Sequence, residues 1–317
     1  MSIIYFIVQQ TMFFSIPLLI VALGGMFSER SGVINIALEG IMIIGAFTGV
    51  LFISIFQEAL PGQPILIIAI ILAALSGVII SLAHAYASIN MKADQVISGT
   101  AINMLAPAFA IYVARVINTV QQIPFKNQFR IPTVPLLGDI PVIGPLLFQN
   151  TYITTYLGFF VLIAAWIVLY RTRFGLRLRS CGEHPQAADS VGINVYGMRY
   201  AGVMISGALA GVGGLVFVIP TSTNFNASVS GYGFLALAVL IFGQWKPAKI
   251  LGAAFFFGLL KAVASSYSGI AFLRDAPISS SVYKMLPYIV TLVVLAFTSK
   301  KSQAPKAEGI PYDKGTR

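Results

Sequence analysis

The chain has 317 residues, of which 57% are hydrophobic and only 9% are charged. Soluble globular domains have about a quarter charged residues, so this composition excludes that class and predicts a polytopic membrane protein. The net charge of +10 comes from basic residues in loops and near the C-terminus, where membrane orientation and anionic lipid explain it better than nucleic acid does. The single cysteine, Cys181, rules out an internal disulfide.

About nine apolar segments (8–10) are predicted to cross or enter the bilayer, which makes the fold all-α. They cover residues 3–27, 33–56, 64–87, 95–116, 152–170, 200–220, 232–245, 250–267 and 282–298. The connections rich in Lys and Arg are expected in the cytoplasm, which places the N-terminus outside the cell membrane and the C-terminus inside. The proline-rich stretch 118–150 and the uncharged loop 221–230 are expected outside.

We expect one transmembrane domain, residues 1–298, built from two internal repeats at about 1–170 and 200–298. Residues 171–199 lie between the repeats and are here called the coupling segment. Residues 299–317 form a basic cytoplasmic tail that is predicted to be disordered. Glycines at Gly32 to Gly40 and Gly231 to Gly243 occupy corresponding places in the two halves and indicate broken or re-entrant helices. Glycines that allow close helix packing are the alternative.

The coupling segment is the long polar interruption in this apolar sequence. It contains five arginines, Arg171, Arg173, Arg177, Arg179 and Arg199. Between them, residues 185–191 are predicted to form a short helix, since Pro185 suits its first turn and Gly192 can end it. A helix too polar to insert, next to an arginine cluster, offers a surface to a cytosolic partner.

Four stretches resemble one family of membrane proteins along most of the chain. They read ERSGVINIALEG at 29–40, QVISGTAIN at 95–103, GEHPQAADSVGI at 182–193, and GYGF at 231–234 followed by GQWKP at 243–247. They are similar to the permeases of ABC importers in the branched-chain amino acid, ribose and nucleoside superfamily. The first stretch most resembles the nucleoside (guanosine-type) and simple-sugar subgroup.

The resemblance implies that the short helix is a coupling helix on which an ATPase docks; a solvated loop is the alternative. The residues so implied are Gly182, Glu183, His184, Pro185, Ala187, Ala188, Gly192 and Ile193. It also implies a second, non-identical permease, a cytosolic ABC ATPase that uses ATP and Mg, and an extracytoplasmic substrate-binding protein. The chain has no P-loop motif and only two histidines, so we expect no bound cofactor, no metal site and no enzymatic activity of its own.

Polar and aromatic residues within the apolar segments are candidates for the substrate pathway. Glu39 would lie about 12 Å beyond Ser31 along a helix, and a buried ionisable group suggests function. Asn35 and Asn103 could bind a polar ligand, and Phe225 or Tyr232 could stack on a nucleobase. Structural pairing of Glu39 with Lys261, helix-to-helix hydrogen bonds and interface anchoring are the alternatives.

These features predict the permease subunit of an ATP-driven ABC importer that takes up purine-type nucleosides. A ribose or simple-sugar permease is the second hypothesis. A proton-coupled secondary transporter that uses Glu39 as its proton site is the competing class, and a channel ranks third.

Overall fold

The computed structural model describes residues 2–269, 279–298 and 303–315. Its elements in chain order are α1 (Ser2–Arg30), α2 (Leu38–Phe56), α3 (Gln63–Ala85), η1 (Tyr86–Asn90), α4 (Gln95–Asn118), β1 (Ile123–Pro124), β2 (Ile131–Thr133), η2 (Gly144–Phe148), β3 (Gln149–Thr151), α5 (Ile153–Arg171), α6 (Arg173–Glu183), α7 (Pro185–Ser190), α8 (Val195–Thr221), β4 (Asn224–Phe225), α9 (Tyr232–Phe242), α10 (Pro247–Ser266), η3 (Tyr267–Gly269) and α12 (Ser280–Thr298).

Within the described residues, seven helices are long and apolar enough to cross a membrane: α1, α2, α3 (continued by η1), α4, α5, α8 and α10. Helix α9 has only 11 residues, a length of about 16 Å, roughly half of a bilayer core. The predicted all-α polytopic architecture is confirmed. The exact count of nine spans, the two repeats and the orientation stay predictions.

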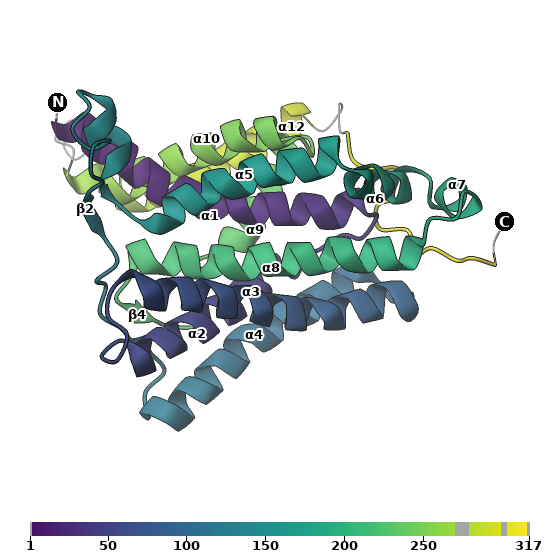
Figure 1. Cartoon of the computed structure of the whole chain (residues 1–317), viewed down its shortest axis with the longest axis horizontal. Coiled ribbons are helices and arrows are strands. Elements are labelled where there is room, and N and C mark those ends of the chain that lie inside the picture. Colours follow the sequence, from purple (N-terminus) through teal and green to yellow (C-terminus); the bar gives the residue numbers. More distant parts are fainter. Residues whose placement is uncertain (1, 270–278, 299–302, 316–317) are drawn as a thin grey trace.

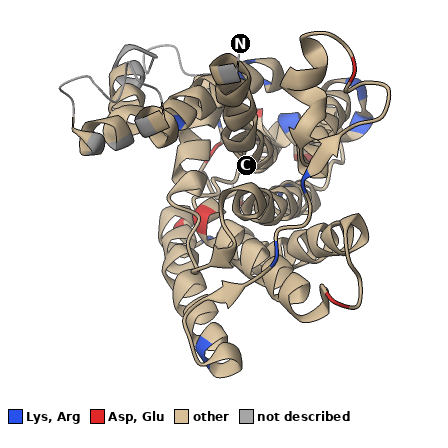
Figure 2. Ribbon diagram, turned by 90° about the vertical axis from the view of Figure 1, so that its left-hand side faces the viewer, with Lys and Arg blue, Asp and Glu red and all other residues tan. Residues whose placement is uncertain are grey.

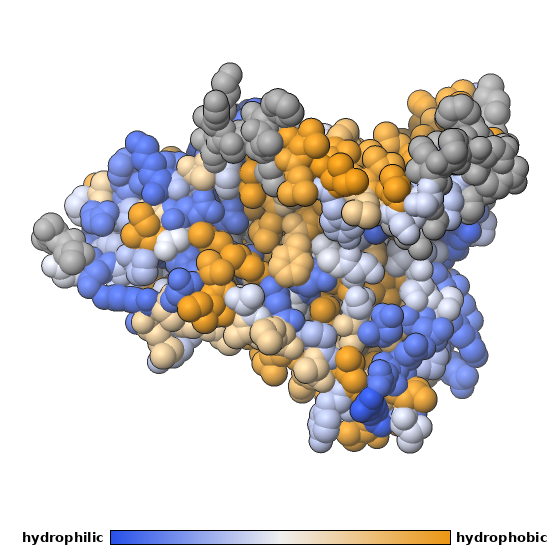
Figure 3. Space-filling model, turned by 180° about the vertical axis from the view of Figure 1, so that it is seen from behind, coloured by the Kyte–Doolittle hydropathy of each residue, from blue (hydrophilic) through white to orange (hydrophobic). Residues whose placement is uncertain are grey.

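The long helices lie side by side, and their ends define two ends of the molecule (Figure 1). One end carries α6 and α7 and is called the α7 end; the other carries the short strands and is called the β end. Seen from the β end, acidic and basic residues are sparse on the ribbons (Figure 2). An apolar band crosses the middle of the surface, with more polar surface towards both ends (Figure 3), as a bilayer-spanning protein requires.

Helices α1, α2, α3 and α8 form the centre of the bundle. Their inward side chains, such as Leu18, Met26, Ile41 and Leu215, are fully buried. Helix α4 diverges from the bundle towards the β end (Figure 1) and exposes apolar side chains such as Met104 and Tyr112. Apolar side chains on that outer surface can contact lipid or another membrane subunit.

Two short antiparallel pairings organise the β end. Strand β1 pairs with β4, with Ile123 opposite Phe225, and β2 pairs with β3, with Ile131 opposite Thr151. The first pairing joins the proline-rich stretch to the uncharged loop, two segments that are about 100 residues apart in the chain. Both therefore belong to one cap over the β end.

Candidate functional site

The coupling segment contains two helices rather than one. The predicted short helix is present as α7, begun by Pro185 and followed by Gly192 with a left-handed φ of +82°. The preceding arginine-rich stretch, which we expected to be loop, is the helix α6, capped where Gly175 N donates to the Thr172 hydroxyl (3.2 Å). Apolar residues alternate with arginines in this stretch, a pattern that does not indicate an amphipathic helix. Helix α7 projects from the bundle (Figure 1).

One face of α7 is anchored and the other is free. Pro185 and Ala188 are buried against the protein, whereas Ala187 is exposed and Val191, one turn later, is 75% exposed. Among the other predicted coupling residues, Gly182 is buried, Glu183 and Ile193 are half-buried, and His184 and Gly192 are exposed. A small apolar patch at the tip of a rigidly held helix suits insertion into a groove of a partner.

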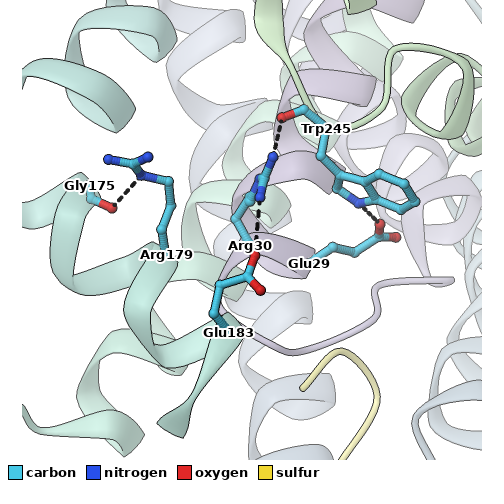
Figure 4. A network of polar contacts seen from close by, with 6 residues as sticks. All are labelled: Glu29, Arg30, Gly175, Arg179, Glu183 and Trp245. Atoms are coloured by element: carbon cyan, nitrogen blue, oxygen red, sulfur yellow. Dashed lines mark hydrogen bonds and ion pairs between the residues drawn. The ribbon is translucent and has the colours of Figure 1, made fainter. Parts of the chain in front are cut away.

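A polar junction connects the coupling segment to the bundle (Figure 4). The guanidinium of Arg30, at the end of α1, lies 3.6 Å from the Glu183 carboxylate and donates to the Trp245 carbonyl (3.1 Å). The Trp245 indole N–H donates to the Glu29 carboxylate (2.5 Å). On α6, Arg179 Nε donates to the Gly175 carbonyl (3.3 Å). The end of α1 thus contacts both the coupling segment and the turn between α9 and α10.

Sequence reasoning assigned no role to Glu29, Arg30 or Trp245. Their signal was present, because Glu29 and Arg30 open the first family-like stretch and Trp245 lies in the last one. What the sequence could not give was the fold that brings two stretches more than 200 residues apart into contact. Of these side chains Arg30 is 12% exposed, and both Glu29 and Trp245 are 4% exposed.

The predicted interruption of the first repeat lies at residues 31–37, between α1 and α2. Side chains from α3 and α4 satisfy its backbone: Ile34 N donates to Gln95 Oε1 (2.7 Å), and His84 Nε2 donates to the Ile34 carbonyl (2.9 Å). Asn103 Nδ2 donates to the Ile36 carbonyl (2.9 Å), and its Oδ1 accepts from Gly40 N (2.7 Å) in the first turn of α2. Non-helical backbone at membrane depth is stable only with such internal partners.

The predicted interruption of the second repeat meets the first one at Glu39. Its carboxylate accepts hydrogen bonds from Gly231 N (2.9 Å) and Gly233 N (2.6 Å), which open α9. A carboxylate at a helix N-terminus satisfies free amide groups and complements the helix dipole. Gly233 permits this approach, because a Cβ there would collide with the backbone of Glu39. The first turn of α2 and the N-terminus of the short helix α9 are therefore joined through one side chain.

The other pathway candidates divide into two locations. Asn35, in the first interruption, donates to the Ser206 hydroxyl of α8 (2.9 Å). Tyr232, between the two glycines that bond Glu39, packs its ring on Phe217 with centroids 4.0 Å apart. Phe225 lies apart from them in β4, at the β end. The Lys261 ammonium lies over the Tyr232 ring, 5.9 Å from its centroid. The Glu39 carboxylate instead accepts hydrogen bonds from the start of α9, so the structure pairs each of these two side chains with a different partner.

Most of these candidates are buried in the part of the chain that the structure describes, and Asn103 is half-buried. Asn35 is 0% exposed, Tyr232 1% and Phe225 2%, and Glu39 and Asn103 are hydrogen-bonded to backbone. In this conformation of a single chain they support the two interruptions. Their contact with a substrate stays a prediction.

A recess of about 360 Å³ opens at the β end. It is lined by Ser54, Gln57, Pro124, Phe125, Lys126, Thr223 and Asn224. Ser54 of α2 and Gln57, the residue after α2, hold its rim. The Ser54 hydroxyl donates to the Pro124 carbonyl (2.9 Å), and Lys126 N donates to Gln57 Oε1 (2.9 Å). The recess lies beside the β1–β4 pairing, where the two loops of the cap meet.

Comparison with known proteins agrees with this geometry. The chain is 45% identical to the guanosine ABC transporter permease protein NupQ of Bacillus subtilis, over 100% of this chain and 99% of that protein. It is 43% identical to the nucleoside ABC transporter permease protein NupC of Lactococcus lactis (97% and 96% covered). It is 29% identical to the putative glucose ABC transporter permease protein TsgC13 of Haloferax volcanii (90% and 89% covered).

No solved structure matches the chain. The model of the family described as branched-chain amino acid transport system / permease component matches residues 7–295, which include both interruptions and the whole coupling segment. This chain is therefore a multi-pass membrane protein that belongs to that ABC permease family.

Proposed function

We propose that the chain is the permease subunit of an ATP-driven importer that takes up nucleosides of the purine type. The observation that carries the transport mechanism is the exposed face of α7, held by a junction that also contacts the turn before α10. The substrate class rests on the similarity to a guanosine permease and a nucleoside permease along the full chain. A simple-sugar importer is the second candidate, favoured by the weaker similarity to a putative glucose permease.

In this proposal the α7 end lies in the cytoplasm. The arginines at the start of the coupling segment support that orientation, since basic residues next to spans remain on the cytoplasmic side. A cytosolic ATPase subunit binds the exposed face of α7 at Ala187 and Val191. That subunit binds ATP together with Mg and hydrolyses the ATP.

Motion of α7 reaches the membrane interior through two sets of contacts. A displacement of Glu183 pulls on Arg30, whose guanidinium also bonds the Trp245 carbonyl at the end of α9. At its other end α9 is bonded to Glu39 of α2. A rigid short helix held at both ends can shift as a unit, which would open or close the path between α2, α4 and α9.

The other partners follow from the two remaining surfaces. An extracytoplasmic binding protein delivers ligand to the cap at the β end, where the recess lies beside the pairing of the two loops. A second, non-identical permease completes the pore, and the apolar outer surface of α4 and α5 is available to it and to lipid.

Uptake measurements in the source cells test the substrate. Radiolabelled guanosine and ribose are supplied to cells with and without the gene. We expect the loss of the gene to abolish guanosine uptake and to leave ribose uptake intact. Loss of ribose uptake alone would move the assignment to sugars, and no change in either would refute the substrate class.

An inhibitor comparison in the same cells separates the energy sources. A proton-coupled transporter with Glu39 as its proton site would stop when an uncoupler collapses the proton gradient, even while ATP is maintained. An ABC importer is expected to be inhibited by vanadate under those conditions. Guanosine uptake that resists vanadate and requires the gradient would favour the secondary transporter.

A further inference from the structure

The C-terminal segment follows a defined path across the α7 end, although the sequence predicts a disordered tail there. Pro305, Ala307 and Tyr312 are buried, and residues 303–315 run past α6 and α8 towards α7 (Figure 1). Residues 299–302 and 316–317 of the predicted tail lie outside the described residues. Residues 305–314 are called the C-terminal strap below.

Backbone hydrogen bonds attach the strap to three different parts of the α7 end. Ala307 N donates to the Gly182 carbonyl at the end of α6 (2.8 Å), and Gly309 N donates to the Gly32 carbonyl after α1 (3.1 Å). Arg199 of α8, only 1% exposed, donates through Nη1 to the Ile310 carbonyl (2.9 Å). The strap thus supplies an acceptor to a buried cation, which is costly to leave without one.

A glycine allows the strap to turn at its tightest point. Gly309 has a φ of +75°, a conformation that other residues rarely adopt. A Cβ at this position would lie 2.8 Å from Ile34 Cδ1, in the interruption between α1 and α2. Few other residues would therefore let the strap lie this close to the membrane helices.

The far part of the strap holds α7 itself. Tyr312 packs in a small apolar cluster with Cys181, Ala188 and Val195, and these contacts bury the inner face of α7. Its ring also meets that of Tyr196 edge-on, with centroids 5.5 Å apart. Lys314 Nζ lies 4.0 Å from the Asp189 carboxylate on α7.

An ion pair connects the same part of the strap to the turn before α4. Lys92 Nζ lies 2.6 Å from Asp313 Oδ2, and this pair raises the pKa of Lys92 and lowers that of Asp313. Both side chains are largely exposed, so the pair adds orientation rather than much affinity. The strap therefore connects α7 to α8, to the backbone after α1 and to the turn between η1 and α4 by contacts of different kinds.

We propose that the C-terminal strap is a positioning element of the transporter, which fixes α6 and α7 to the membrane helices so that a push on α7 moves those helices. This inference rests on the proposed docking of an ATPase on α7. Helix α7 has six residues and is too short to be stable by itself. Without the strap its inner face would lose Tyr312, and α7 would move without carrying the bundle with it.

The native cysteine reports on the strap independently of any transport activity. Cys181 is the only cysteine of the chain and is 0% exposed in the cluster with Tyr312. Burial raises the pKa of its thiol, which further slows its reaction. The first experiment follows maleimide labelling of this subunit in the assembled complex, for the full chain, for a chain ending at Ser302 and for Gly309→Val.

Labelling of Cys181 is expected to be at least tenfold faster in both strap variants than in the full chain. Lys306→Ala, which changes an exposed residue of the strap, is the matched control and should label like the full chain. Equal, slow labelling in all four proteins would refute the proposal that the strap holds α6 and α7 in place, whatever the complex transports.

The second experiment measures coupling in proteoliposomes that contain the complete complex. We expect the Gly309→Val and truncated complexes to keep ATP hydrolysis while the number of guanosine molecules imported per ATP falls at least fivefold. Fast labelling with an unchanged ratio would overturn the positioning role. Failure of the proposed function appears differently, as a full-length complex that imports no guanosine with ATP.

Discussion

The carboxylate of Glu39 offers the sharpest test of how the two interruptions are joined. The change is Glu39→Gln, which preserves size but replaces one acceptor oxygen with an NH₂ group. Because both carboxylate oxygens accept amide hydrogen bonds from α9, the variant must set its NH₂ group against one of those N–H donors. Loss of one hydrogen bond to a charged group costs about 1.5–3 kcal/mol.

The assay is thermal unfolding of the purified chain, and the reaction of Cys181 with a thiol-reactive fluorophore serves as the readout. This thiol is buried, so it reacts when the fold opens. Domains of 150–250 residues lose about 2–4 °C in Tm per kcal/mol, and on that scale we expect Tm to fall by roughly 3–12 °C. Guanosine uptake by the same variant should fall, because α9 would no longer move together with α2.

The matched control is Glu58→Gln. Glu58 is 85% exposed at the β end and lies 3.6 Å from Lys126 in a surface ion pair. Such pairs contribute about 0–1 kcal/mol, so the control should shift Tm by no more than about 4 °C. A Glu39→Gln variant that melts with the control, or above the unmodified chain, would refute the reasoning.

Three further changes test the α7 end. Val191→Asp places a charge on the exposed tip of α7 and should reduce co-purification of the ATPase subunit at least tenfold. Leu136→Asp, at a residue of the β end that is even more exposed, should not reduce it, and equal recovery of the ATPase with both variants would contradict docking at this tip. Trp245→Phe removes the indole donor from the buried Glu29 and should cost about 1.5–3 kcal/mol in the unfolding assay, while the exposed Trp166→Phe should cost little; similar Tm values would contradict the junction. Burial raises the pKa of Glu308 and outweighs a hydrogen bond with Glu29 and the charge of Arg30, which both lower it. The docked strap therefore favours the protonated carboxyl of Glu308. The strap should loosen as the pH rises from the ordinary carboxyl range through that raised pKa. The rate of Cys181 labelling, normalised to that of the truncated chain at each pH, should increase over this pH range, and Glu308→Gln should abolish the increase. Identical pH profiles for the unmodified chain and Glu308→Gln would contradict this prediction.

Much of the architecture could be predicted because the bilayer imposes simple lengths on apolar segments. The interruptions were visible as glycines near Asn35 and Glu39, and the short helix as a proline followed by a glycine. These are local signals that depend on backbone conformation and burial. They required no knowledge of which segments touch.

Contacts between distant segments could not be predicted in the same way. The sequence marks Glu39 as a buried acid, but only the fold shows that its partners are amide groups of α9, 192 and 194 residues away. Likewise the strap is polar and lacks an apolar period, so its composition favours disorder. Its order comes from single contacts, such as Tyr312 against Cys181 and Gly309 against Ile34.

The most direct test of the account is guanosine import by the purified complex in proteoliposomes with a defined energy source. The account predicts accumulation that requires ATP, stops with vanadate, and needs no proton gradient. Accumulation driven by a proton gradient in the absence of ATP would contradict it, and would return Glu39 to the role of a proton site.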